Sequence, residues 1–288
     1  MAEIISVITN ISVVAFVVTS MLAMGLSLTI KQVTDPLRNL RLVALALVAN
    51  FVLVPLVALF LRAVLPLREG HAIGLILLAT AAGAPFLPKL TQAAKGNIAL
   101  SVGLMVLLMI VTVIYVPIVL PLLLPGVSVN PLDIAKSLVI LMLIPLAIGL
   151  FVRARYPETA ADLQPKFAQI SNTAFMLLFV TMLLLNWRTI LGAIGSGAII
   201  AAVIFIAASF AIGYLLAGRD PGTRSVLGLG TGQRNVSAAL VVAGQNFTDP
   251  DVLVMVLTGA VLMLVILMPL AGELGKRLAG APQIAEIE

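Results

Sequence analysis

Long apolar segments, separated by short polar ones, run through the whole sequence. We count nine of them, at residues 4–30, 40–65, 71–95, 97–124, 131–153, 165–187, 189–217, 222–246 and 251–275. An α-helix needs about 20 apolar residues to cross a bilayer, whereas a strand of a membrane barrel needs only about 9–11 alternating ones. The segments therefore predict an all-α polytopic membrane protein with about nine transmembrane helices. We expect residues 1–288 to form a single transmembrane domain, with no soluble domain attached.

The composition agrees with this interpretation. Only 10% of the residues are charged and 61% are hydrophobic, while soluble domains average about 25% charged residues. The chain has no cysteine, which excludes disulfides and thiolate-bound metals. The basic residues lie at segment ends instead of forming a phosphate-binding stripe, so we expect contact with membrane lipid and not with nucleic acid. Nothing in the sequence implies a protein partner.

The basic residues also predict the orientation. One side of the expected bundle carries eleven of them: Lys31, Arg38, Arg41, Lys95, Arg153, Arg155, Lys166, Arg219, Arg224, Lys276 and Arg277. The other side carries four: Arg62, Arg68, Lys136 and Arg188. The positive-inside rule then places the N-terminus outside and the C-terminus in the cytoplasm. We expect an integral protein of a bacterial inner (plasma) membrane.

Two of the apolar segments are interrupted at corresponding places. The first break, GAPFLPK at 83–89, has two prolines, and the second, GTGQRN at 230–235, is polar and rich in glycine. The stretches after the two breaks are also similar, AAKGNIALSVGLMVL at 93–107 against VAGQNFTDPDVLVMVL at 242–257. We predict inverted repeats at 4–124 (one helix short) and 131–275, unless the similarity is a chance match between apolar stretches. Paired interrupted segments point to the binding site of a transporter.

The sequences KGNIALSV (95–102) and GQRNVSAAL (232–240), each at a break, resemble the bile acid:sodium symporter family. The resemblance extends over nearly the whole chain and implies the family's nine-helix form. It implies a core domain, in which two discontinuous helices cross near mid-membrane, and a separate panel domain. It also implies transport of organic anions by alternating access, with sodium as the usual driver.

The chain departs from the sodium ligands that the resemblance implies. The family's ligands include a Ser-Asn pair, a Glu, two Gln and two hydroxyls. At the positions of the pair, the Glu, the two Gln and one hydroxyl, this chain has Leu87, Pro88, Gly230, Arg234, Val54 and Met105. Ser101, which matches the other hydroxyl, and Asn235 remain. Two side chains and backbone carbonyls would form a poor cage for a hard cation, and a fixed guanidinium would repel the ion. We therefore expect no cofactor and no sodium coupling through the usual sites. The alternative is a sodium-dependent symporter of the usual family type.

Arg234 is the sharpest candidate for a functional residue. Its side chain has five N–H donors, stays charged and suits carboxylate or sulfonate recognition. Nine of the twelve Asp and Glu residues lie outside the apolar segments, and the other three, Asp133, Asp251 and Glu273, lie within three residues of a segment end. No carboxylate deep within a span therefore neutralises Arg234. It would bind an anionic substrate or supply a built-in charge in place of sodium. The alternatives are that it caps carbonyls at the helix break or reaches an acid in a loop.

Lys89 lies six residues before Lys95, about 9 Å along a helix, so its side chain either serves the crossing or extends to the cytoplasmic interface. Desolvated beside Arg234, it would be the one plausible proton-coupling group. Other polar residues would line the site or bond helices to one another. The predicted substrate-binding residues are Arg234, Asn235, Gln233, Thr231, Lys89 and Thr91, and the predicted ion-coupling residues are Lys89, Ser101 and Asn235.

These features favour a secondary transporter of small organic anions, either bile-acid-like molecules or carboxylates. An intramembrane enzyme would need a nucleophile or an acid–base pair at depth, but cysteine is absent and the carboxylates lie outside the segments or at their ends. The single histidine, His71, begins a segment, and we expect it to be solvated at the interface. No channel filter and no nucleotide-binding motif occur in the sequence.

Overall fold

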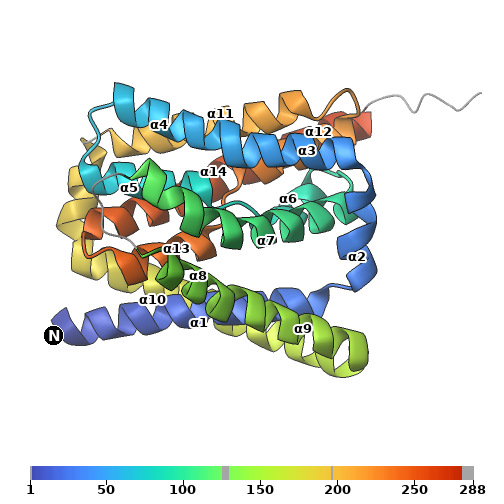
Figure 1. Cartoon of the computed structure of the whole chain (residues 1–288), viewed down its shortest axis with the longest axis horizontal. Helices are drawn as coiled ribbons and strands as arrows, with labels where there is room; N and C mark the ends of the chain where they lie inside the picture. Colours follow the sequence, from blue (N-terminus) through green and yellow to red (C-terminus); the bar gives the residue numbers. More distant parts are fainter. Residues whose placement is uncertain (1, 125–129, 196, 281–288) are drawn as a thin grey trace, which may run out of the picture.

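The computed structural model describes residues 2–124, 130–195 and 197–280, and every regular element within these residues is a helix (Figure 1). Five helices are long and apolar enough to span a membrane, and shorter apolar helices accompany them. The prediction of an all-α polytopic membrane protein is therefore confirmed. The division into two inverted repeats stays a prediction.

The helices follow the apolar segments closely. In chain order they are α1 (Ala2–Ser27), α2 (Ile30–Thr34), α3 (Leu40–Val48), α4 (Val54–Val64), α5 (Glu69–Thr80), α6 (Leu87–Ala93), α7 (Ile98–Leu123), α8 (Pro131–Leu138), α9 (Ile144–Arg155), α10 (Pro157–Ile194), α11 (Ala198–Leu216), α12 (Pro221–Gly232), α13 (Val236–Asn246) and α14 (Pro250–Gly280). A 3-10 turn, Asp35–Arg38, follows α2.

One expected boundary is wrong. The sequence suggested a break at Arg188, but α10 continues to Ile194 and α11 begins at Ala198. Reversal of the chain requires a backbone that an ordinary residue adopts poorly, and Gly197 supplies it with φ +77°. The polar residues near 188 therefore lie within a helix instead of ending it.

Two of the spans change pitch where proline enters them. The π-helix Ala49–Leu53 joins α3 to α4 just before Pro55, and Val139–Leu143 joins α8 to α9 just before Pro145. Proline has no N–H to donate and its ring crowds the preceding turn, so a wider turn accommodates it.

Tyr115 of α7 stabilises the first of these wide turns. Pro55 cannot donate to the carbonyl four residues earlier, and that carbonyl, Phe51 O, instead accepts a hydrogen bond of 2.6 Å from Tyr115 Oη. The two rings also pack together, with their centroids 4.8 Å apart. This contact fixes α7 against the α3–α4 span, next to the candidate site.

The helices form two layers. Helices α1, α9 and α10 pack against one another and lie on one side, and the remaining long helices lie on the other (Figure 1). Within the first layer, Gly25 of α1 faces Gly149 of α9 so closely that a Cβ on Gly25 would lie 2.8 Å from Gly149 Cα. Small residues permit such close helix contacts in membranes, where burial of apolar surface alone does not drive association.

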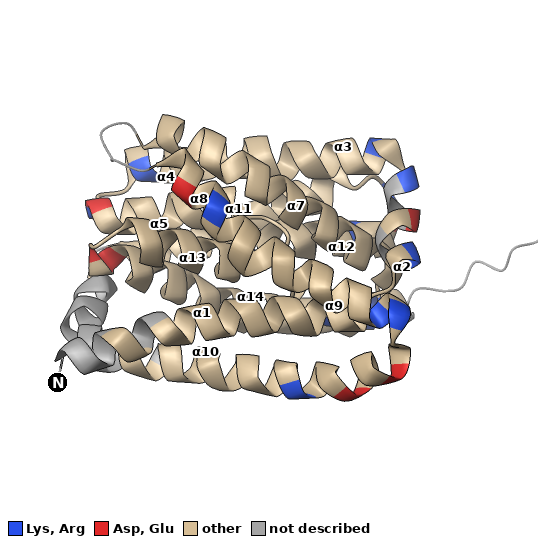
Figure 2. Cartoon of the chain, turned by 60° about the horizontal axis from the view of Figure 1, so that its bottom comes forward, with Lys and Arg blue, Asp and Glu red and all other residues tan. Residues whose placement is uncertain are grey.

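Charged residues gather at the two ends of the bundle. Basic residues concentrate at the end formed by α2, the start of α3 and the end of α9, whereas the opposite end, near the start of α5, is mixed (Figure 2). His71 lies at this mixed end and corrects our expectation, because its side chain is fully buried. Its Nε2 atom lies 3.6 Å from the carboxylate of Asp251, which the first turn of α14 places over it.

Candidate functional site: the crossing of two broken helices

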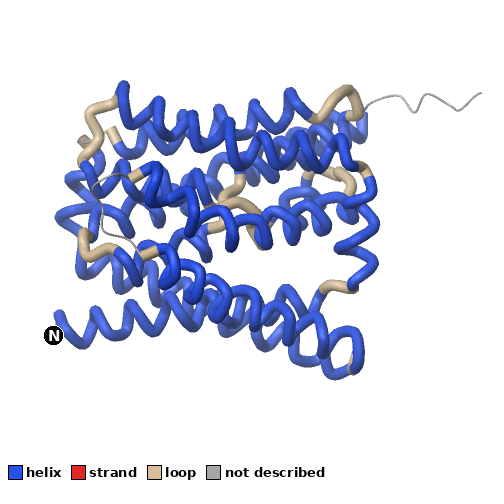
Figure 3. Tube along the Cα trace, viewed as in Figure 1, coloured by secondary structure: helices blue, strands red, loops and turns tan. Residues whose placement is uncertain are grey.

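Helix α5 ends at Thr80 and α6 starts at Leu87, so the first break runs through the interior of the bundle (Figure 3). Gly83 has φ +80°, and a Cβ there would overlap the backbone of Met109 in α7. Only glycine suits both constraints. The unwound backbone finds a partner in Thr112, whose Oγ1 accepts from Ala82 N (2.9 Å) and donates to Ala82 O (3.1 Å).

Asn235 links the second break to the first. Its backbone N–H donates to Ala81 O (2.9 Å) and its side-chain Nδ2 donates to Gly83 O (2.9 Å). Its Oδ1 accepts from Ala238 N (3.0 Å) and so caps the start of α13. Asn235 is fully buried, and its side-chain bonds all go to the protein. It holds the crossing together instead of lining a cavity.

The guanidinium of Arg234 lies between the C-terminal ends of α5 and α12. Nε donates to Leu78 O (3.0 Å), Nη2 to Ala79 O (2.8 Å) and Nη1 to Thr231 O (3.1 Å). Nη1 also donates to Asn50 Oδ1 (2.6 Å). The side chain is fully buried, with an exposed fraction of 0%. Of the two alternatives that the sequence left open, carbonyl capping is the one observed.

Helix dipoles supply the counter-charge that no carboxylate provides. Each helix C-terminus carries about −0.5 of an elementary charge, so two of them facing one guanidinium come close to neutralising it. Within the described chain, Arg234 has no Asp or Glu within ion-pair distance. The crossing therefore holds a permanent cation at a place where the C-terminal ends of two half-helices create a negative electrostatic potential.

Asn50 completes this arrangement from the π-helix between α3 and α4. Its Oδ1 accepts from Arg234, while Nδ2 donates to Ala46 O (2.9 Å) and to Thr231 Oγ1 (3.2 Å). The role of Asn50 follows from its position in the bundle and could not be assigned from its residue type alone. Thr231 consequently faces Asn50 and the backbone of Gly213 in α11.

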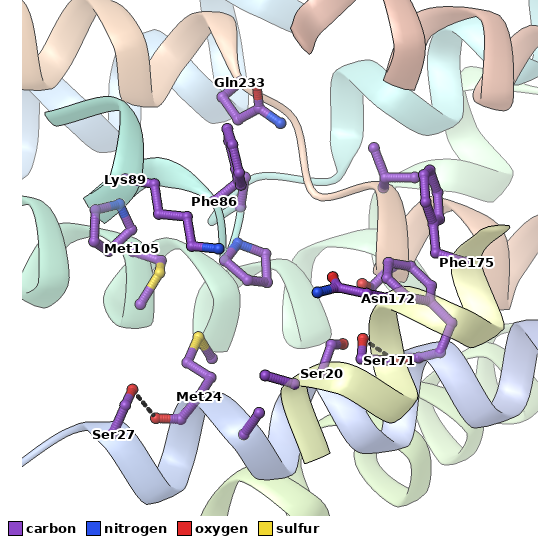
Figure 4. A pocket seen from close by; sticks show the side chains of 18 of the residues that line it. Ser20, Met24, Ser27, Phe86, Lys89, Met105, Ser171, Asn172, Phe175 and Gln233 are labelled. Atoms are coloured by element: carbon purple, nitrogen blue, oxygen red, sulfur yellow. Dashed lines mark hydrogen bonds between the residues drawn. The ribbon is translucent and has the colours of Figure 1, made fainter. Parts of the chain in front are cut away.

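A cavity of about 410 Å³ lies between the two helix layers and reaches the crossing. Residues of α1 and α10 form one wall (Figure 4). The other wall consists of residues from the two breaks and from α6, α7, α13 and α14. Its volume falls within the range typical of small-molecule sites. It extends from the crossing to Ser27 and Gln164, close to the end of α1 and the first turns of α10, at the basic end of the bundle.

Of the predicted residues, Lys89, Gln233 and Arg234 contribute to the cavity wall. Lys89 is exposed and projects into the cavity, with Nζ 5.6 Å from the centroid of the Phe86 ring (Figure 4). Gln233 has an exposed fraction of only 4%, and its Oε1 accepts no hydrogen bond within the described chain.

The remaining predicted residues lie apart from the cavity. Thr91 is buried on α6 with its hydroxyl lacking a hydrogen-bond partner among the described residues. Ser101 is buried at the start of α7, where its Oγ donates to Ile98 O (2.7 Å). Thr231 and Asn235 form the crossing itself. The structure therefore does not gather Lys89, Ser101 and Asn235 into one ion site.

Comparison with known proteins gives a consistent family. A model of the sodium bile acid symporter family matches residues 14–193, more than half of the chain. A probable sodium/metabolite cotransporter of rice (Oryza sativa subsp. japonica), BASS2, chloroplastic, is 27% identical over 81% of this chain and 57% of its own length.

Two proteins of Arabidopsis thaliana also match, and their names likewise describe probable sodium/metabolite cotransporters, chloroplastic. BASS3 is 26% identical over 78% of this chain and 54% of its own length. BASS1 is 27% identical over 84% of this chain and 61% of its own length. The chain thus spans between about half and three-fifths of the length of these relatives.

Proposed function

From the premise that the chain belongs to the sodium bile acid symporter family, we propose that it is a secondary transporter of small organic anions that does not couple to sodium through the usual sites. It is an integral membrane protein, and its family consists of transporters and not enzymes. Its substrate occupies the cavity between the helix layers. Alternating access follows if the layer of α1, α9 and α10 moves against the crossing.

The observation that carries this proposal is the buried guanidinium of Arg234. In transporters with broken helices, unwound carbonyls and half-helix C-termini are the groups that hold sodium or a proton. Here the carbonyls of Leu78, Ala79 and Thr231 are already occupied by a covalently attached cation. A guanidinium neither loses its proton nor dissociates, so it stabilises the crossing in every state of the cycle. A transported cation is then unnecessary at this place.

The position of the cavity supports an orientation for this state. Its lining extends to Ser27 and Gln164, at the end where basic residues gather. If that end faces the cytoplasm of a bacterial cell, as the positive-inside rule predicts, the N-terminus lies outside and the C-terminus inside. The cavity then extends toward the cytoplasmic side in this state.

The second candidate is a sodium-dependent symporter, and the names of the relatives favour it. It would require sodium to bind away from Arg234. Within the described residues, no group of three or more His, Asp or Glu side chains could hold a metal ion. Neutral oxygens of the backbone, hydroxyls and amides would have to supply the ligands, so the two candidates differ sharply in what they predict.

The test is uptake by proteoliposomes containing the purified full chain, using a panel of labelled carboxylates and sulfonates. Sodium is replaced by choline at fixed pH. We expect undiminished uptake without sodium and a loss of uptake in Arg234→Gln. Arg219→Gln, an exposed arginine outside both the crossing and the cavity, is the matched control and should transport normally. Strictly sodium-dependent uptake by the unmodified chain would overturn the proposal.

A further inference from the structure

Two cations line the cavity, and only Lys89 is both exposed and without a hydrogen-bond partner among the described residues, whereas Arg234 is fully buried. Arg234 donates four hydrogen bonds to protein acceptors, which use four of its five N–H groups. Lys89 makes no hydrogen bond or ion pair with any described residue, and its nearest defined contact is the face of Phe86. An ammonium over an aromatic face keeps its three N–H groups available.

We propose that Lys89 is the substrate's anion anchor, and that the two walls of the cavity select a ligand with one negative charge over a dianion. This inference rests on the proposed function and assigns the residues that determine selectivity in the same cavity. It also changes the role of Arg234, which supports the crossing and does not hold the substrate. The two roles make separate predictions.

Gln233 supplies a second polar group on the same wall. It extends from the second break toward Phe86, and its amide is almost entirely buried with the oxygen unpaired in the described chain (Figure 4). A buried polar atom without a partner costs about 1–3 kcal/mol, so the amide oxygen favours a ligand that brings a donor. The amide N–H groups bond to no described residue and can donate to the carboxylate held by Lys89. Lys89 and Gln233 come from different broken helices, so a ligand that contacts both would bind directly at the crossing.

The opposite wall has the complementary polarity. The hydroxyls of Ser20, Ser27 and Ser171 donate to the carbonyls of Val17 (2.8 Å), Met24 (2.7 Å) and Phe16 (3.3 Å), respectively. Since each hydrogen atom is already used, these serines present lone pairs to the cavity. They favour a ligand group that donates, such as a hydroxyl, and disfavour a second carboxylate.

Charge and apolar surface limit the ligand further. The described residues that line the cavity include no Asp or Glu, and Lys89 is the only exposed cation among them. A second negative charge on the ligand would therefore be desolvated without a cationic partner, which is costly. The walls also carry apolar side chains, Met24 and Phe175 on the α1–α10 side and Met105 on the other, which suit an apolar body. The result is selectivity for monoanions over dianions.

The test measures equilibrium binding of radiolabelled ω-hydroxyhexanoate to the purified full chain, with unlabelled hexanoate, hexanamide and adipate as competitors. We expect ω-hydroxyhexanoate to bind most tightly, then hexanoate, then the dianion adipate, with no competition by hexanamide. Lys89→Gln should weaken binding at least about tenfold, the effect of losing one charge-assisted hydrogen bond. Lys89→Arg keeps the charge and should retain most of the affinity.

Lys95→Gln is the matched control, because Lys95 lies six residues further along, outside the cavity, and its replacement removes the same charge. Its affinity should be unchanged. Ser20→Ala should reduce the advantage of ω-hydroxyhexanoate over hexanoate, whereas Gln233→Met should weaken both ligands alike. Unchanged affinity in Lys89→Gln, competition by hexanamide equal to that by hexanoate, or preference for adipate would each overturn the assignment.

Uptake measured in parallel separates this inference from the proposed function. If sodium-free uptake persists while Lys89→Gln binds normally, the anchor is wrong and the transporter assignment stands. If uptake requires sodium while Lys89→Gln loses binding, the anchor is right and the sodium-free mechanism is wrong. Absence of binding by every member of the series would overturn the assignment of this cavity as the anion site.

Discussion

Replacing Arg234 by alanine should turn a structure with a built-in cation into one that needs an added cation. The change removes four hydrogen bonds and leaves the carbonyls of Leu78, Ala79 and Thr231 and the Asn50 Oδ1 without their donor. These four oxygens then surround the space that the guanidinium occupied. Oxygen atoms of this kind suit a hard cation such as sodium.

The size of the effect follows from the contacts. Each buried acceptor left unpaired costs about 1–3 kcal/mol, and the desolvation of the guanidinium, several kcal/mol, is recovered. We expect a net loss of about 3–5 kcal/mol in a sodium-free buffer, the range found when one partner of a buried charged contact is removed. Sodium at 100 times its dissociation constant would restore about 2.7 kcal/mol.

The assay is thermal unfolding of the purified chain in detergent, in choline chloride and in sodium chloride at equal ionic strength. The unmodified protein should unfold at the same temperature in both salts. Arg234→Ala should unfold about 6–20 °C lower in choline, taking about 2–4 °C per kcal/mol, and should recover part of the loss in sodium. Arg219→Ala serves as the exposed control. An Arg234→Ala protein as stable as the unmodified one in choline would refute the reasoning, and so would sodium stabilisation of the unmodified protein.

Two further predictions concern the supports of the crossing. Tyr115→Phe keeps the ring contact but removes the hydroxyl that donates to Phe51 O, so we expect a loss of about 1–3 kcal/mol in the free energy of unfolding. The control Tyr156→Phe, at an exposed position, should change the stability little. Equal stability of the two variants would contradict the role of the Tyr115 hydroxyl. Asp220 caps α12 by accepting from Thr223 N (2.7 Å), and the hydrogen bonds from the Thr223 side chain and backbone lower the pKa of its carboxyl. Because the folded-state pKa is the lower one, this contribution is complete above the unfolded-state pKa, near 3.8, and is lost as the pH falls through the folded-state pKa. Asp220→Ala should lower the free energy of unfolding by about 1 kcal/mol at neutral pH. Asp220→Asn should keep most of the cap and abolish its acid sensitivity. Thermal unfolding of both variants across pH tests these expectations.

The sequence predicts the breaks well because their cause is local. Proline removes a backbone donor, as at Pro85 and Pro88, and glycine permits φ +80°, as at Gly83, so the interruption of α5–α6 follows from the residue types themselves. The arginine at the second break is also conspicuous, since an intramembrane cation has few inert explanations. Long apolar segments likewise predict the helices.

Residue types do not predict which groups meet across the bundle. The partners of Arg234 on α5 are main-chain carbonyls about 155 positions away, and any residue type would carry the same oxygen. Residue types alone therefore left both capping and substrate binding open. His71 was misjudged for a related reason: its burial depends on where the first turn of α14 packs. The same limit hides the role of Asn50.

The most direct test of the sodium-free mechanism is a double-label flux measurement. Proteoliposomes containing the purified full chain are given a transported organic anion with one label and radioactive sodium with another, and both influxes are followed over the same initial interval. We predict rapid anion uptake with sodium influx no greater than in protein-free liposomes, because Arg234 supplies the cation at the crossing. Sodium entering in a fixed ratio to the anion would contradict this mechanism.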